Sequence, residues 1–293
     1  MQILMGTGSY SNDDWGGLLY PEGTKKTDYL RVYAQHYNAV EINSSFYNIP
    51  GTKAFAGMAE RAAGRLQFAV KLHQTFTHLR HYDTNDLERM LKSPAPLREQ
   101  GILGPFLAQF PYSFHRTTEN RKYLWELAQH FGGEQLALEL RHGSWDKDEV
   151  REGFSEHGLI WVSPDYPRLE GMTDSLLRSS GKTAYLRLHG RNNATWWEGK
   201  DAAERHDYRY SESELEKIAG DIAALGSDAH ARLELVDTLW VVFNNTTKGH
   251  ALYNIQMLKN LLEGRGLKVQ GKALEPGVLE NKMFEGGLFG KID

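Results

Sequence analysis

The sequence predicts an α/β protein built as a single (β/α)₈ TIM barrel, with eight parallel strands and a C-terminal extension. Eight short apolar runs recur along the chain, and amphipathic or polar linking segments separate them. Strands that alternate with helices form parallel βαβ units, and eight such units close a barrel. An open, doubly wound sheet is the competing topology. The length of 293 residues fits the barrel, which typically takes about 250 residues as one domain.

The predicted strands are runs of a few mostly apolar residues, many of them β-branched or aromatic. Their last residues are often polar, which places polar groups at the carboxyl ends of the strands. We predict strands at Ile3–Gly8, Ala39–Ser44, Leu66–His73, Gly104–Phe110, Gln135–Arg141, Leu159–Ser163, Ala184–Gly190 and Leu239–Asn244.

Helical periodicity fills most of the intervals between these strands. The spacing of Ser211 and Glu214 is that of a capping box at a helix start, and Gly101 and Gly158 follow helical periods where a left-handed C-cap is expected. The segment 165–180 is less clearly helical. We predict helices at Thr27–Tyr37, Thr52–Ala63, Thr84–Glu99, Thr118–His130, Asp146–His157, Ser211–Leu225 and Lys248–Leu262.

The chain divides into two parts by composition. Residues 1–263 carry the alternating pattern and form the predicted barrel domain. Residues 264–293 are rich in Gly and Lys with scattered apolar side chains. We expect this extension to pack on the barrel surface, or to serve as a lid or an oligomer contact; the sequence leaves the oligomeric state open.

Composition excludes several classes of function. A net charge of −4 argues against a protein that coats duplex nucleic acid, although it allows a local cationic pocket. The chain has no cysteine, so disulfides, thiolate metal sites and cysteine nucleophiles are excluded. No stretch reaches the roughly 20 apolar residues that cross a bilayer, and the first ten residues lack a signal-peptide pattern. We therefore expect a cytoplasmic protein with no membrane partner.

The strongest functional signal is the sidedness of the strands. Side chains alternate across a strand, so if Val40 and Ile42 face the helices, Glu41 and Asn43 face the barrel lumen. Six of the eight strands carry polar residues inward near their C-terminal ends, where barrel active sites lie. An internal ion-pair network that serves only the fold is the alternative. The remaining inward residues are Lys71, His73, Gln109, Glu139, Arg141, Arg187, His189 and Asn244.

The inward residues suggest separate catalytic and binding roles. Glu139 is the predicted general base, Glu41 is a second carboxylate that could share the acid and base roles, and His189 is a proton donor. Guanidinium groups suit a carboxylate or phosphate ligand, and inward cations outnumber inward anions. The predicted substrate contacts are Asn43, Tyr47, Lys71, His78, Gln109, Arg141, His142, Trp145, Arg187, Arg191 and Asn244.

Aromatic residues gather near the loops that follow the strands. They could stack on a sugar or nucleobase ring, or pack in the core or at the rim. The long polar loop 192–209 could close over a ligand. The aromatic candidates are Tyr20, Phe46, Tyr47, Trp145, Trp196 and Trp197.

No cofactor is predicted. The twelve histidines show no H-x-x-x-H or H-E-x-x-H spacing, and neither a Walker loop nor a G-x-G-x-x-G fingerprint occurs. A divalent metal remains a lesser alternative, because histidine and glutamate could assemble in space. The residues that could contribute are Glu41, His73, His78, Glu139 and His189.

At these same positions the sequence resembles a known family, the domain of unknown function 72, also called YecE-like. The resemblance covers about residues 1–262 and implies a TIM barrel, while the activity of the family is not established. By fold the family is similar to apurinic endonuclease and sugar isomerase barrels, which is an analogy of fold alone. The matching segments are 6–10, 40–47, 68–71, 109–114, 138–145, 185–191 and 243–246.

Two functional hypotheses follow. The first is an enzyme of hydrolase or lyase type that acts on an anionic, ring-bearing substrate, such as a sugar phosphate or a nucleic-acid fragment. The second is a non-catalytic protein that binds nucleic acid or a metabolite in the same mouth. The expected partner is a small anionic ligand or a flexible, single-stranded nucleic acid, and whether the site is catalytic stays open at this point.

Overall fold

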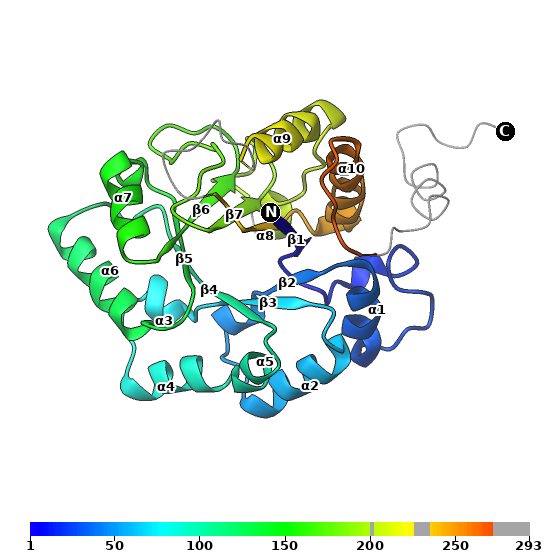
Figure 1. Cartoon of the computed structure of the whole chain (residues 1–293), viewed down its shortest axis with the longest axis horizontal. Helices are drawn as coiled ribbons and strands as arrows, with labels where there is room; N and C mark the ends of the chain where they lie inside the picture. Colours follow the sequence, from blue (N-terminus) through cyan, green and yellow to red (C-terminus); the bar gives the residue numbers. More distant parts are fainter. Residues whose placement is uncertain (200–201, 226–234, 272–293) are drawn as a thin grey trace.

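Eight parallel strands close into a barrel in chain order, as the sequence predicts (Figure 1). The computed structural model describes residues 1–199, 202–225 and 235–271. Hydrogen bonds between β1 and β8 complete the cylinder. The strands are β1 Gln2–Thr7, β2 Ala39–Ile42, β3 Gln67–Lys71, β4 Leu103–Phe110, β5 Leu136–Leu140, β6 Ile160–Asp165, β7 Thr183–Leu188 and β8 Thr238–Phe243.

Helices surround the barrel and link successive strands (Figure 1). The capping box at Ser211 and Glu214 is formed, since each residue hydrogen-bonds the backbone N–H of the other. Short 3₁₀ turns supplement the helices, among them η3 Ser44–Phe46 and η4 Gly143–Trp145. The helices are α1 Tyr29–His36, α2 Thr52–Ala62, α3 Gln74–Thr77, α4 Thr84–Lys92, α5 Ala95–Glu99, α6 Thr118–His130, α7 Asp148–Glu156, α8 Ala202–Arg205, α9 Glu212–Leu225 and α10 His250–Gly264.

One predicted helix is divided, and the segment that the sequence leaves less clearly helical contains no helix. The helix predicted over Thr84–Glu99 is divided into α4 and α5 at Pro94, because proline lacks the N–H and its ring clashes with the preceding turn. The segment between β6 and β7 forms no helix, and its backbone instead bridges the strand ends at His142–Met172 and Ser179–Ala184. The sixth crossover therefore leaves an irregular loop at the mouth of the barrel.

The alternation of side chains creates two apolar layers. Val40, Phe68 and Val70 pack outward against the helices, whereas a separate inner set fills the lumen. Gly104 makes room for this filling, since a Cβ there would lie 2.3 Å from the ring of Trp240. Open space therefore remains at the C-terminal ends of the strands. The inner set is Leu4, Ala39, Ala69, Leu107, Ala137, Ile160, Val162, Tyr185, Trp240 and Val242.

The start of the C-terminal extension lies against the barrel. Val269 is buried and forms a parallel bridge to Ile3 in β1, and Lys259 donates to the carbonyl of Gly271 at 2.5 Å. The rest of the predicted extension, residues 272–293, lies outside the described residues. Among the helices that the structure describes, none is long and apolar enough to span a bilayer.

Candidate functional site

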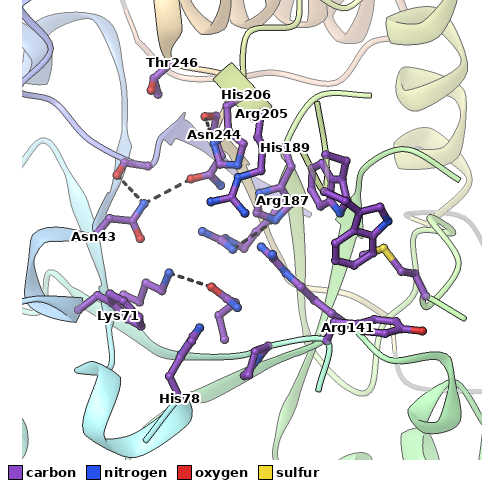
Figure 2. A pocket seen from close by; sticks show the side chains of 18 of the residues that line it. Asn43, Lys71, His78, Arg141, Arg187, His189, Arg205, His206, Asn244 and Thr246 are labelled. Atoms are coloured by element: carbon purple, nitrogen blue, oxygen red, sulfur yellow. Dashed lines mark hydrogen bonds between the residues drawn. The ribbon is translucent and has the colours of Figure 1, made fainter. Parts of the chain in front are cut away.

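A cavity of about 650 Å³ opens where the carboxyl ends of the strands meet the following loops (Figure 2). Nine of the predicted site residues line it: Asn43, Tyr47, Lys71, His78, Gln109, Arg141, Arg187, His189 and Asn244. The other lining residues are Gly8, Phe46, Pro111, Tyr112, Ser113, Met172, Trp196, Trp197, Arg205, His206 and Thr246.

The charged side chains on the cavity wall are all cationic. Lys71, Arg141, Arg187 and Arg205 come from different elements and converge on the space, and the described lining includes no Asp or Glu (Figure 2). The Nε of Arg205 is buried and has no hydrogen-bond partner among the described residues. Several donors are thus available to a ligand, and an anion is the ligand that this wall attracts.

The two predicted catalytic carboxylates lie beneath the cavity, where both side chains are fully buried. Arg187 binds Glu41 through Nε at 2.9 Å and Nη2 at 2.5 Å, and its Nη1 donates to Glu139. The hydroxyl of Tyr185 donates a further bond of 2.9 Å to Glu41. A buried charge is tolerated when it is paired and hydrogen-bonded, so this network holds both carboxylates away from the cavity wall.

Glu139 is poorly suited to accept a proton at neutral pH. Burial raises the pKa of its carboxyl group, but Arg187, His189 and Arg141 outweigh burial and hold the pKa well below its ordinary value. Arg141 contacts it through Nε at 3.0 Å, while no partner engages the Nη groups of Arg141 within the described part of the chain. The geometry therefore favours an anchoring role for Glu139, which orients Arg141 and His189.

His189 presents a free ring nitrogen in a buried position. Its Nε2 lies 3.3 Å from Glu139 and 3.4 Å from Nη1 of Arg187. Because a carboxylate can only accept and Nη1 already donates to Glu139, we assign the Nε2–H tautomer, which satisfies the shorter contact. Its Nδ1 is buried and lacks a partner among the described residues. Burial lowers the pKa of His189 to about 4, against the opposing charge of Glu139, so the ring is neutral at pH 7. A neutral ring with an unoccupied lone pair can accept a proton from a ligand.

Lys71 ends β3 and extends its amine into the cavity (Figure 2). Its Nζ donates to Oε1 of Gln109 at 3.0 Å and lies 4.5 Å from the centre of the Phe46 ring. Burial is the main cause that lowers the pKa of Lys71 to about 7, and the charge of Arg187 acts in the same direction. This amine is therefore partly neutral at physiological pH.

Two asparagines are fixed at the cavity edge by a close approach of the first strand. Asn43 donates to the carbonyl of Gly8 at 2.7 Å and lies 3.3 Å from Oδ1 of Asn244. A Cβ at Gly8 would lie 2.1 Å from Oδ1 of Asn244, so a side chain at this position would displace the Asn244 amide. Oδ1 of Asn43 and Nδ2 of Asn244 remain unpartnered among the described residues, which leaves one acceptor and one donor for a ligand.

Aromatic side chains form part of the wall and rim. Tyr47 and Trp197 are 72% and 57% exposed, whereas Trp196 is buried and lies below Arg141, with 5.7 Å between the guanidinium and the ring centre. The ring of Tyr112 lies 5.3 Å from that of Trp197. Exposed rings beside cationic groups can stack on a planar or cyclic part of a ligand.

Three predicted contact residues lie outside the cavity lining. The ring of His142 stacks on His115 at 3.8 Å, behind the cavity residue Tyr112. Trp145 is buried and donates from Nε1 to the carbonyl of Phe114 at 2.7 Å. Arg191 forms two bonds with Asp165 and one with Glu214, so the structure does not bring it to the cavity. The Arg191 bonds are 2.9, 2.7 and 3.0 Å long.

Two further sequence candidates lie away from the cavity, and some cavity residues are not among those that the sequence predicts. His73 was predicted to face the lumen, but the strand ends at Lys71 and His73 instead caps α3 by accepting from the N–H of Thr75. Tyr20, a stacking candidate, is buried against Tyr29. Tyr112 and Met172 were not singled out as site residues. Tyr112 comes two residues after the end of β4, and this position beside a strand end could have indicated a cavity residue. Met172 lies in a loop without periodicity, so the sequence gives no such indication.

A metal centre finds little support in this arrangement. Across 1–199, 202–225 and 235–271, no three His, Asp or Glu side chains gather as metal ligands would. Glu41 and Glu139, two of the residues that the sequence made available for this purpose, are bound to Arg187 instead.

Comparison with known proteins places the chain among relatives of unknown function. A family model described as "Protein of unknown function DUF72" matches residues 4–277. The UPF0759 protein YunF of Bacillus subtilis is 29% identical over 267 residues, which are 85% of this chain and 92% of that protein. The UPF0759 protein YecE of Escherichia coli is 27% identical over 148 residues, 46% of this chain and 52% of that protein.

Solved structures of DUF72 proteins share the barrel. A crystal structure of a DUF72 family protein from Thermotoga maritima superposes with a TM-score of 0.79 at 33% identity, covering 90% of this chain and 100% of that one. A DUF72 family protein from Enterococcus faecalis gives a TM-score of 0.79 at 24% identity, covering 94% and 98%, which supports the fold alone.

Proposed function

This chain belongs to the DUF72 family of proteins of unknown function, and from its cavity we propose that it is an enzyme for a small, anionic, ring-bearing substrate. A phosphorylated sugar is the representative substrate. The reaction is of hydrolase or lyase type, and it takes place in the mouth of the barrel.

One observation carries this proposal: the charges of the site are sorted by depth. The cavity wall offers Lys71, Arg141 and Arg205 to a ligand, while the carboxylates Glu41 and Glu139 are fully buried below it and bound to Arg187. An internal network that served only the fold would leave its cations paired. Here the terminal groups of Arg141 face the cavity, and no carboxylate among the described lining residues repels an incoming anion.

The proposal gives each part of the cavity a function. The guanidinium groups hold the anionic group of the substrate, and the exposed rings of Tyr47 and Trp197 contact its ring. His189 accepts a proton at Nδ1, while Glu139 holds the opposite edge of the imidazole. A carboxylate that orients a histidine in this way fixes the ring position and stabilises the charge that forms on proton uptake.

The cavity shape favours a compact ligand over an extended nucleic acid. The volume of about 650 Å³ is within the range of small-molecule sites, and the net charge of the chain is −4. A bound single strand needs a cationic track along several phosphates and therefore binds with a steep dependence on salt. The binding test must therefore distinguish a small phosphate ester from a single-stranded oligonucleotide as the ligand.

Titration calorimetry tests the binding half of the proposal. The probes are inorganic phosphate, glucose 6-phosphate, ribose 5-phosphate, glucose and a short single-stranded oligonucleotide. We expect the phosphate esters to bind and glucose not to bind, and Arg141→Gln to weaken ester binding about tenfold or more, the loss of one charge-assisted contact. Arg31→Gln, on the exposed face of α1, is the matched control.

The catalytic half is tested by turnover of the esters that bind. His189→Asn should lower turnover by about 100-fold or more while ester affinity changes little, since the ring supplies a proton acceptor. Binding of the oligonucleotide alone, or ester affinity that Arg141→Gln leaves unchanged, contradicts the proposal.

A further inference from the structure

We propose that Lys71 is an amine nucleophile that forms an imine with a carbonyl group of the substrate. This inference rests on the proposed function of the cavity and narrows it. The substrate class becomes a phosphorylated aldehyde or ketone, and the reaction becomes one of lyase type.

The position of Lys71 is the first argument. It is the last residue of β3, so a rigid strand aims its side chain at the cavity, and the Phe46 ring and Gln109 hold the amine in place. Its hydrogen-bond partner Gln109 is a neutral amide. Within the described residues, no carboxylate lies within ion-pair distance of this amine.

Two described lysines on helices have the opposite environment. Lys92 and Lys217 lie on exposed helical faces and pair with Glu88 at 2.9 Å and Asp221 at 3.0 Å. Both amines are solvent-exposed and paired with a carboxylate. Lys71 differs in burial, in partner and in the charge of its surroundings.

The electrostatics of the cavity explain why the amine can be reactive. Burial lowers the pKa of Lys71 to about 7, Arg187 and Arg141 lower it, and Glu41 and Glu139 raise it. Glu41 and Glu139 raise the pKa of Lys71 only to a limited extent, because Arg187 binds both carboxylates. His78, which also lines the cavity, has its pKa lowered to about 4 by burial and by the charge of Lys71, so it adds no positive charge at pH 7. A lysine beside other cations in a desolvated site is a recognised source of a nucleophilic amine.

The reaction balances without a cofactor. The neutral Nζ of Lys71 attacks the carbonyl carbon, a C–N bond forms, and the C=O double bond opens to a hydroxyl group after a proton passes from nitrogen to oxygen. That hydroxyl then takes up one proton from solvent and leaves as water, which gives the protonated imine, with one water released and one proton consumed for each imine formed. The imine then withdraws electrons from the neighbouring carbon, so a proton or a carbon–carbon bond there can be broken.

Neighbouring groups match the needs of such a substrate. Arg141 and Arg205 hold a phosphate across the cavity from the amine, which leaves the carbonyl end to face Lys71 (Figure 2). The unpartnered Nδ1 of His189 can take the proton that the imine makes acidic. Asn43 and Asn244 offer hydrogen bonds to the hydroxyl groups that accompany a sugar carbonyl.

Reductive trapping tests the inference on the full chain. The protein is incubated with dihydroxyacetone phosphate, glyceraldehyde 3-phosphate or pyridoxal 5′-phosphate in the presence of sodium cyanoborohydride, which converts an imine to a stable secondary amine. Peptide mapping by mass spectrometry then locates the adduct. We expect labelling of Lys71 to exceed that of Lys92 by at least about tenfold at pH 7, because burial lowers the pKa of Lys71 to about 7, whereas the amine of Lys92 is exposed and paired with Glu88.

Controls separate this inference from the proposed function. Dihydroxyacetone, which lacks the phosphate, should label Lys71 much less, and glycerol 3-phosphate, which lacks the carbonyl, should protect it. Lys71→Arg should abolish the adduct while ester binding by calorimetry persists. The mapping itself identifies the labelled lysine, so it does not depend on how the variant folds.

Two results overturn the inference in different ways. Ester binding without an adduct at Lys71, or with labelling no greater than at Lys92, shows that Lys71 is only an anion contact and leaves the proposed function standing. If no phosphate ester in either panel binds, the proposed function fails and this inference fails with it.

Discussion

Replacing Arg187 with methionine removes the guanidinium that joins two buried carboxylates while keeping most of the side-chain volume. Arg187 makes two hydrogen bonds to Glu41 and one to Glu139. After the change, Glu139 retains Arg141 and His189, whereas Glu41 retains the hydroxyl of Tyr185. Breaking a buried pair by removing one partner costs about 3–5 kcal/mol. We expect Arg187→Met to lose that much unfolding free energy at pH 7, chiefly through Glu41.

Urea unfolding followed by circular dichroism measures this loss. Arg31→Met, an exposed control, should stay within about 0.5 kcal/mol of the wild type. Adding Glu41→Gln to Arg187→Met should recover at least about 1 kcal/mol, because the unpaired buried charge is then gone. A loss below about 1 kcal/mol for Arg187→Met, or no recovery in the double variant, would refute the electrostatic reasoning.

The same variant has a pH dependence of known sign. The depressed pKa of Glu139 contributes stability that is present above the unfolded-state pKa near 4.3 and is lost as pH falls through the folded-state pKa. Removing Arg187 takes away the largest charge that lowers this pKa, so the carboxyl group protonates more readily. The deficit of Arg187→Met relative to the wild type should therefore shrink as pH falls from about 5 to about 3, around and below the unfolded-state pKa. A constant deficit across this interval would contradict that assignment.

Three further predictions concern the cavity. Affinity for sulfate, whose charge is constant, should fall as pH rises through the Lys71 pKa of about 7, and Lys71→Arg should remove this dependence in calorimetry. Gly8→Ala should weaken ester binding with little loss of stability, because the added Cβ displaces the end of the Asn244 side chain. Gly6→Ala, its comparison, should unfold the protein, because the added Cβ would lie 1.8 Å from a backbone carbonyl oxygen of β2. Trp197→Ala should cost about 1–3 kcal/mol of binding for a ring-bearing ester and nothing for inorganic phosphate.

The alternation of inward and outward side chains along the strands made the barrel and part of its lumen predictable. All eight predicted strands are present, and the alternation that starts from Val40 and Ile42 places Glu41 inward as expected. The helix-free segment between β6 and β7 and the break within Thr84–Glu99 were less predictable. In the second case Pro94 imposes a break that helical periodicity alone does not show.

The candidate site was predictable on the strands and much less so beyond them. Alternation no longer holds two or three residues beyond a strand end, so His73 caps α3 and Arg191 pairs with Asp165 and Glu214 instead of facing the cavity. Residues on loops, such as Met172, carry no period that would reveal their position. Sequence also does not show which charges pair, and that pairing converts Glu139 from the predicted general base into a buried anchor for Arg187 and His189.

A crystal structure of the protein soaked with tungstate tests the central claim most directly. The claim is that the barrel mouth is a preformed anion site because its carboxylates are held below by Arg187. The account predicts anomalous density for an ordered tungstate in the cavity, within hydrogen-bond distance of Arg141 and of at least one of Lys71, Arg187 and Arg205. An empty mouth in crystals that bind tungstate elsewhere, with Arg141 turned onto a carboxylate, would contradict it.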